Sequence, residues 1–284
     1  MEKPMNRARK RSDGLNRAAV LLLTGLMLVL SARGAGAVSA KSWQGCDKTA
    51  VQPACGGIER TQEGWEKFEQ PSGGTYTSPR MWYWIYKPEN IRPGKPLVIY
   101  LHSTVGCCNQ ALIDPLPQMI NAGIITDPEA VIVVPQLPGN FESKWTAAAE
   151  SVTNLVNRLV EEYQLDPERV AMTGFSLGGV YCWDIANSTP GRYTRFMSIC
   201  GRVHYLRIKV ESFEGCEVRV YTALRDPNVN PASAISFAEW LAEAGIPATH
   251  TEMNLSHAEV PRAVFADPEV QEWLWMKPAE STGR

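Results

Sequence analysis

One serine of the chain lies in a spacing that suits a nucleophile. The segment Gly174-Phe175-Ser176-Leu177-Gly178 has the pattern G-x-S-x-G and follows an apolar run at 169–173. Small neighbours allow a tight, strained turn there, so that the hydroxyl projects clear of the backbone at the start of a helix. We therefore predict that Ser176 is a nucleophile, with a glycine-rich helix start as the alternative.

A serine hydroxyl becomes a good nucleophile when a histidine takes its proton and an acid orients that histidine. Where the nucleophile occupies a strand-turn-helix, the expected chain order is serine, acid, histidine. Asp226 follows a predicted strand at 218–224, and His257 follows the last predicted strand, at 249–255. The sequence thus predicts a triad of Ser176, Asp226 and His257. The alternatives are a turn role for Asp226, which precedes a proline, and a structural or surface role for His257.

The oxyanion that such a serine generates needs backbone N–H donors. The first is expected from Leu177, directly after the serine, and the second from the loop after an early strand. That strand ends at Leu101, so Ser103 or Thr104 is the predicted second donor. His102 is expected to shape this loop through hydrogen bonds rather than to take part in the chemistry.

The segments that position these residues alternate between two periodicities. Apolar, aromatic or β-branched runs predict strands at 81–86, 97–101, 131–134, 169–173, 196–199, 218–224 and 249–255. Helical spacing predicts helices within 145–163, after Ser176, at 234–244 and at 264–275. Such alternation predicts an α/β fold, with a mostly parallel sheet covered by helices on both faces. Sites in these sheets lie beyond the carboxyl ends of the strands, where the predicted triad falls.

Three segments carry a resemblance to the α/β-hydrolase superfamily, which covers about residues 80 to 276. They are Pro96 to His102, Gly174 to Asp184, and Ala266 to Leu274. More narrowly, the chain resembles the secreted esterases and "predicted peptidases" near polyhydroxybutyrate depolymerases, feruloyl esterases and dienelactone-hydrolase-like enzymes. The resemblance implies the same triad and the α/β-hydrolase fold. The chain departs from the group's usual His-Gly at His102-Ser103, which puts the second oxyanion donor in question.

The resemblance implies a serine hydrolase that cleaves carboxylic esters through an acyl-enzyme, without a metal or organic cofactor. About fifteen residues separate Cys200 from Cys216, where many relatives insert a helical lid, so no sizeable lid is expected. Trp145 is a candidate substrate-binding residue, with core packing as the alternative. The expected partner is a small or polymeric ester. The alternatives are a serine peptidase of prolyl-oligopeptidase-like type and a catalytically inactive binding module.

The N-terminus has the order of a secretory signal: a basic stretch, an apolar run at 18–30, and small residues up to Ala40. We predict a signal peptide at 1–40, an irregular extension at 41–78 and the hydrolase domain at 79–284. The predicted location is secreted or periplasmic, without a stable membrane partner after cleavage. The alternative is an uncleaved N-terminal anchor that keeps the domain outside the cytoplasm.

Charge and cysteine content narrow the partners further. Residues 1–40 hold seven basic and two acidic side chains of the chain's 28 and 30, so the remainder carries 21 basic and 28 acidic side chains. This acidic balance argues against nucleic acid as a partner. Seven cysteines follow Ala40, and an oxidising compartment predicts some disulfides. Cys46 and Cys55 could close a small loop, while an odd total leaves at least one thiol unpaired or paired with another molecule.

Overall fold

The fold is that of a computed structural model, which describes residues 64–76, 78–88, 91–106, 110–137 and 145–276. All of these residues belong to one compact unit. The predicted signal peptide and four of the cysteines (Cys46, Cys55, Cys107 and Cys108) lie outside the described residues. Among the helices of the described part, none combines the length and the apolar character that a membrane span requires.

Eight strands form one sheet in the order β1-β2-β4-β3-β5-β6-β7-β8. The strands are β1 (Trp65–Gln70), β2 (Met81–Tyr86), β3 (Leu97–Leu101), β4 (Val131–Gln136), β5 (Val170–Phe175), β6 (Arg195–Ile199), β7 (Glu217–Ala223) and β8 (Ala248–Met253). The pairs β1·β2 and β2·β4 are antiparallel, and the other pairs are parallel. The sheet is therefore mostly parallel, as predicted.

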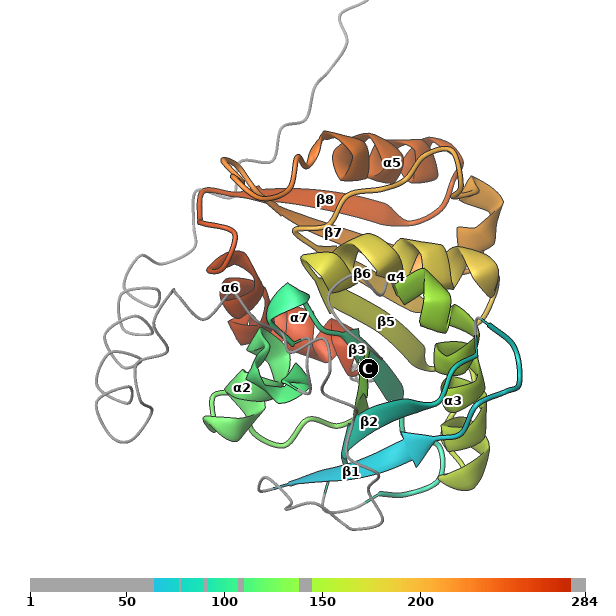
Figure 1. The fold of residues 1–284 in the computed structure, drawn as a ribbon. Helices are drawn as coiled ribbons and strands as arrows, with labels where there is room; N and C mark the ends of the chain where they lie inside the picture. The colour runs from blue at the N-terminus through green and yellow to red at the C-terminus, as the bar shows by residue number, and fades with distance from the viewer. Residues whose placement is uncertain (1–63, 77, 89–90, 107–109, 138–144, 277–284) are drawn as a thin grey trace, which may run out of the picture. The chain divides into compact units, whose positions relative to one another are not determined.

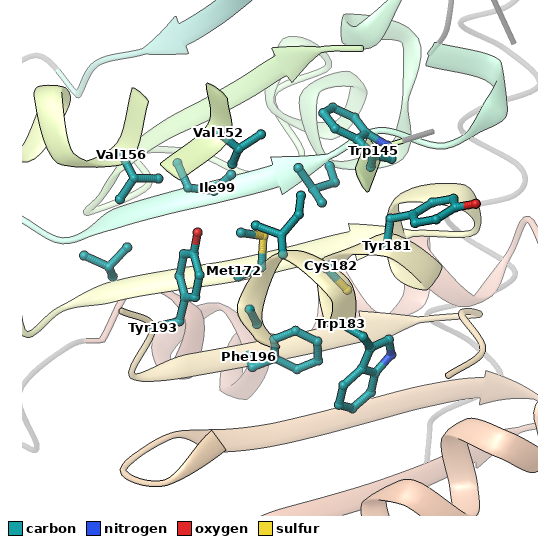
Figure 2. Close-up of a cluster of buried hydrophobic side chains, with 14 of the residues drawn as sticks. Ile99, Trp145, Val152, Val156, Met172, Tyr181, Cys182, Trp183, Tyr193 and Phe196 are labelled. Atoms are coloured by element: carbon teal, nitrogen blue, oxygen red, sulfur yellow. The ribbon is translucent and has the colours of Figure 1, made fainter. Parts of the chain in front are cut away.

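Helices cover both faces of this sheet (Figure 1). They are α2 (Pro115–Asn121), α3 (Ala149–Glu162), α4 (Leu177–Ser188), α5 (Ala232–Glu243), α6 (Val260–Ala266) and α7 (Pro268–Leu274). The central strands are buried on both sides, so alternate residues enter two separate apolar clusters. Ile99 and Met172 lie on the side of α3 and α4 (Figure 2), in the cluster that also includes residues of α5, whereas Val98 and Ala171 belong to the cluster with residues of α2, α6 and α7. This two-sided burial is the α/β architecture that the apolar runs predicted.

Two elements differ from the predictions, and both differences have a local cause. The irregular extension predicted at 41–78 is wrong for residues 65–70, which form edge strand β1. An edge strand needs only a few buried side chains, such as Trp65 in β1. The polar residues Glu66, Lys67 and Glu69 therefore interrupt the apolar pattern from which a strand is predicted. The single helix predicted at 264–275 is two helices, since residue 267 adopts an extended conformation before Pro268.

The connection from β6 to β7 spans residues 200–216 and contains no α-helix, only the 3-10 turn η5 (Val210–Phe213). Helical lids in sheets of this kind are insertions between strands, and none is present in this connection. The expectation of no sizeable lid at this place is confirmed.

Candidate active site

The turn between β5 and α4 holds Ser176 in a conformation that few residues adopt, with φ 53° and ψ −113°. At positions 174 and 178, on either side of this serine, the surrounding backbone leaves room only for glycine. A Cβ on Gly174 would lie 2.5 Å from the carbonyl carbon of Gly178, and one on Gly178 would lie 1.9 Å from the carbonyl oxygen of Leu101. The spacing G-x-S-x-G is thus a packing requirement, because α4 begins against the ends of β3 and β5. Strain of this kind concentrates at functional sites.

The structure brings the three predicted triad side chains together. His257 Nε2 lies 3.0 Å from Ser176 Oγ, and His257 Nδ1 lies 2.6 Å from Asp226 Oδ2. The three residues come from the ends of β5, β7 and β8, although 81 positions separate the serine from the histidine. These distances are within hydrogen-bonding range, so one imidazole connects the hydroxyl to the carboxylate.

The carboxylate of Asp226 is fixed on both oxygens. Its Oδ1 accepts hydrogen bonds from the amides of Asn228 (2.8 Å) and Val229 (3.0 Å), which leaves Oδ2 to the imidazole. The side chain is 2% exposed, against 12% for that of His257. A buried carboxylate that points at Nδ1 favours the tautomer in which Nε2 can accept the proton of a serine. The turn predicted as an alternative role for Asp226 is therefore present as well, and it orients the acid.

Cys200 is a neighbour of this pair that the sequence did not single out. It follows β6 with φ 48°, and its Sγ lies 3.8 Å from the carbonyl oxygen of His257 and beside the Asp226 carboxylate. Burial, followed by the adjacent carboxylate, raises the pKa of the thiol to about 12. Ligand atoms of Cys200, Asp226 and His257 lie within 4.8 Å of one another, a set that transition metals accept. A metal there would have to displace the Asp226–His257 hydrogen bond and a tightly held thiol proton.

The predicted oxyanion donors do not all have a free amide. Leu177 is the first residue of α4, and such an amide has no acceptor within its own helix. The amide of Ser103, in contrast, donates to Asp114 Oδ2 at 2.5 Å. Ser103 is therefore wrong as the second donor in this conformation. Thr104, which begins the 3-10 turn η2 (Thr104–Gly106), has no acceptor for its amide among the described residues.

His102 shapes this loop as expected. It is fully buried, and its Nε2 accepts the amide of Leu137 at 3.0 Å, so Nδ1 carries the proton that it donates to the carbonyl of Ser103 at 2.7 Å. Desolvation lowers the pKa of His102 to about 4, which keeps the imidazole neutral. Gln136 also holds the loop, through a bond from its Nε2 to the carbonyl of Gly106 (3.0 Å).

Trp145 does not line a substrate surface, so this prediction is corrected. Its side chain is 0% exposed and lies within the apolar cluster of Figure 2. Its ring also packs against that of His102, with 4.9 Å between the centroids. An indole without exposed surface cannot contact a ligand. Its apolar area belongs to the core cluster that covers the α3 and α4 face of the sheet.

The disulfides expected from the cysteine count are absent from the described part of the chain. Its three cysteines, Cys182, Cys200 and Cys216, are buried free thiols. Burial raises the pKa of each, which suppresses thiolate formation. They therefore behave as small apolar side chains of the core.

Comparison with known proteins finds hydrolases among the proteins that this chain is similar to. No family model matches the chain. A bifunctional acetylxylan esterase/xylanase of Neocallimastix patriciarum is 28% identical over 123 residues, which are 41% of this chain and 17% of that protein. This chain therefore spans only a small part of that relative.

Solved structures match over more of the chain. A thermostable esterase superposes with a TM-score of 0.59 at 20% identity, over 75% of this chain and 63% of its own. Dipeptidyl peptidase 4 of Porphyromonas gingivalis matches with a TM-score of 0.58 at 11% identity, over 75% of this chain and 35% of its own. At these identities the likeness establishes the fold, and the chain has the α/β-hydrolase fold predicted from its sequence.

Proposed function

We propose that this chain is a serine hydrolase that cleaves carboxylic esters through an acyl-enzyme intermediate. The observation that carries the proposal is the hydrogen-bonded series Ser176–His257–Asp226 at the carboxyl ends of β5, β7 and β8. A strained serine at the start of a helix, an imidazole within 3.0 Å of it and a buried acid behind the imidazole fit nucleophilic acyl transfer.

In the proposed mechanism, Ser176 Oγ attacks the ester carbonyl while His257 Nε2 takes the hydroxyl proton. Asp226 keeps the imidazole in the required tautomer and stabilises its positive charge. The amides of Leu177 and Thr104 hold the oxyanion of the tetrahedral intermediate. His257 then protonates the leaving alcohol, and a water molecule deprotonated by the same imidazole releases the acid.

Esters are the proposed substrate class because the relative from Neocallimastix patriciarum is a bifunctional acetylxylan esterase/xylanase and one of the similar solved structures is a thermostable esterase. The connection at 200–216, without a helix, is compatible with a polymeric ester as well as a small one. We further propose that residues 1–40 direct export, so that the domain acts outside the cytoplasm. The alternative within this proposal is a domain that stays attached through an uncleaved N-terminus.

The test is hydrolysis of 4-nitrophenyl acetate by the purified protein and by Ser176→Ala. Removal of a triad serine lowers kcat by about 10³-fold or more, because only binding and oxyanion stabilisation remain. A fluorophosphonate should also label the wild type at Ser176 and leave the variant unlabelled. Activity that survives the substitution would remove Ser176 from the mechanism.

A serine peptidase is the second candidate, because dipeptidyl peptidase 4 shares the fold. Ester and amide substrates with the same acyl group separate the two functions. Amide cleavage at a rate comparable to that of the ester would favour the peptidase. A protein that cleaves neither substrate and resists the fluorophosphonate would be an inactive binding module.

A further inference from the structure

A buried carboxylate lies beneath the loop that follows β3. Asp114 is 1% exposed, and its Oδ2 accepts hydrogen bonds from the amide of Ser103 (2.5 Å) and the hydroxyl of Tyr100 (3.0 Å). Its Oδ1 accepts the hydroxyl of Ser103 at 2.8 Å. Three donors from the end of β3 and the following loop thus converge on one side chain.

The position of Asp114 would ordinarily give it a different task. It is the N-cap residue of α2, where an aspartate usually accepts a helix amide, yet its side chain makes no capping bond. Burial outweighs the three hydrogen bonds and the attraction of Arg262 on α6, and the pKa of Asp114 is raised to about 6. The carboxylate of Asp114 therefore binds the loop after β3 instead of capping α2, which suggests that its role is to hold that loop.

The hydrogen bonds in the loop after β3 determine which of its amides has no acceptor. The Ser103 hydroxyl that Asp114 accepts also takes the amide of Val105 (3.1 Å), which closes the loop into the turn η2. Between the two bound amides lies that of Thr104, without an acceptor among the described residues. The same loop lies directly against the start of α4, since a Cβ added to Gly178 would lie 1.9 Å from the carbonyl oxygen of Leu101 and 2.9 Å from that of His102.

We propose that Asp114 is a positioning residue for the oxyanion site: by binding both the amide and the hydroxyl of Ser103, it fixes the loop after β3 so that Thr104 supplies the second N–H donor. Asp114 itself does not contact the substrate. Ser103 stands where the group that this chain resembles usually has glycine. Its hydroxyl takes part in this arrangement, because it connects the Asp114 carboxylate to the turn η2. This inference rests on the proposed ester hydrolysis.

The test is a double-mutant cycle with Asp114→Asn and Thr104→Pro, followed by kcat and KM for 4-nitrophenyl acetate. Proline removes the N–H of residue 104 and suits the first position of a helical turn. Thr104→Pro should lower kcat by about 10²-fold, as removal of an oxyanion donor does in other serine hydrolases. Asp114→Asn should lower kcat by about tenfold with little change in KM, because it weakens the hold on the Ser103 amide. Fluorophosphonate end-point titration corrects each rate for the fraction of folded sites.

The double variant decides the matter. If Asp114 acts through the Thr104 amide, its substitution should change kcat less than twofold once that amide is absent. A full tenfold loss in the Thr104→Pro background, or no loss in Asp114→Asn alone, would overturn the proposal. Asp127→Asn, an exposed aspartate replaced in the same way, should keep the wild-type kcat. A wild type that neither hydrolyses the ester nor reacts with the fluorophosphonate would instead refute the proposed function.

Discussion

Gly178→Ala is the substitution for which sequence rules and the structure predict opposite signs. Gly178 is the second residue of α4 and has no positive φ. On helix propensity alone, alanine should stabilise the protein by up to about 1 kcal/mol. In the structure, however, the added Cβ would lie 1.9 Å from the carbonyl oxygen of Leu101 and 2.9 Å from that of His102. Both neighbours are backbone atoms, which cannot rotate away.

The size of the effect follows from the required displacement. Cβ atoms essentially never approach another heavy atom within 3.0 Å, so α4 and the end of β3 must separate by about 1 Å. Overpacking of this kind destabilises by about 1–3 kcal/mol or more. For a domain of this size, 3 kcal/mol corresponds to a fall in Tm of about 6–12 °C. Because the displaced loop carries the proposed second oxyanion donor, a 1 Å shift should also lower kcat/KM by about 10²-fold.

Thermal unfolding and ester hydrolysis, both compared with Gly191→Ala, measure these effects separately. Gly191 has φ +73° and no atom within 4 Å of an added Cβ, so alanine there meets only an unfavourable backbone conformation. That variant should lose about 1 kcal/mol and keep its activity. A Gly178→Ala protein as stable as the wild type, or one that loses no more than Gly191→Ala in both assays, would show that the close approach of β3 to α4 does not constrain the site.

Three further outcomes are expected. Ser176→Gly should abolish hydrolysis yet raise the unfolding free energy by about 1 kcal/mol, since glycine relieves the strain at φ 53°; calorimetry beside Ser176→Ala, which keeps the strain, checks this. Between pH 4 and 6 the raised pKa of Asp114 makes the folded state bind more protons, so its contribution to stability falls as the pH rises, whereas the lowered pKa of His102 makes its contribution rise. Asp114→Asn removes only the falling contribution, so its Tm should increase more steeply with pH than that of the wild type, and parallel curves would contradict this. The three buried thiols, Cys200 included, should resist iodoacetamide in the native protein and react after unfolding, as mass spectrometry would show.

Most of the sheet, and the proximity of Ser176, Asp226 and His257, could be predicted because each depends on a local signal. Strands buried on both faces leave continuous apolar runs, as at 97–101 and 131–134. Once those strands were placed, the residues after them had to meet at one edge of the sheet. Asp226 and His257 could therefore be selected by chain order together with their positions directly after predicted strands.

The oxyanion loop was harder because its signal is not local. Ser103 and Thr104 are both polar residues after the same strand, and nothing in their types distinguishes the two amides. The distinction comes from Asp114, eleven positions further on, whose place before Pro115 is equally typical of a helix start. A side chain that takes one of two neighbouring amides is visible only when β3 and α2 are packed together.

Trp145 was assigned to the wrong environment for a related reason, since an indole after a strand suits either a cleft or a core. In the structure its ring packs on His102, and His102 in turn binds the carbonyl of Ser103. The large apolar side chain thus helps to bury the imidazole that shapes the loop, and this burial lowers the pKa of His102. Trp145 belongs to the core cluster on the α3 and α4 face of the sheet, whereas Asp114 binds Tyr100 of the cluster on the opposite face. Both side chains contact the segment that follows β3, Trp145 through His102 and Asp114 through Ser103. The proposed chemistry at Ser176 therefore depends on packing from both layers of helices. A substitution of Trp145 or Asp114 should lower kcat by displacing the loop after β3, even where the distances among Ser176, His257 and Asp226 stay the same.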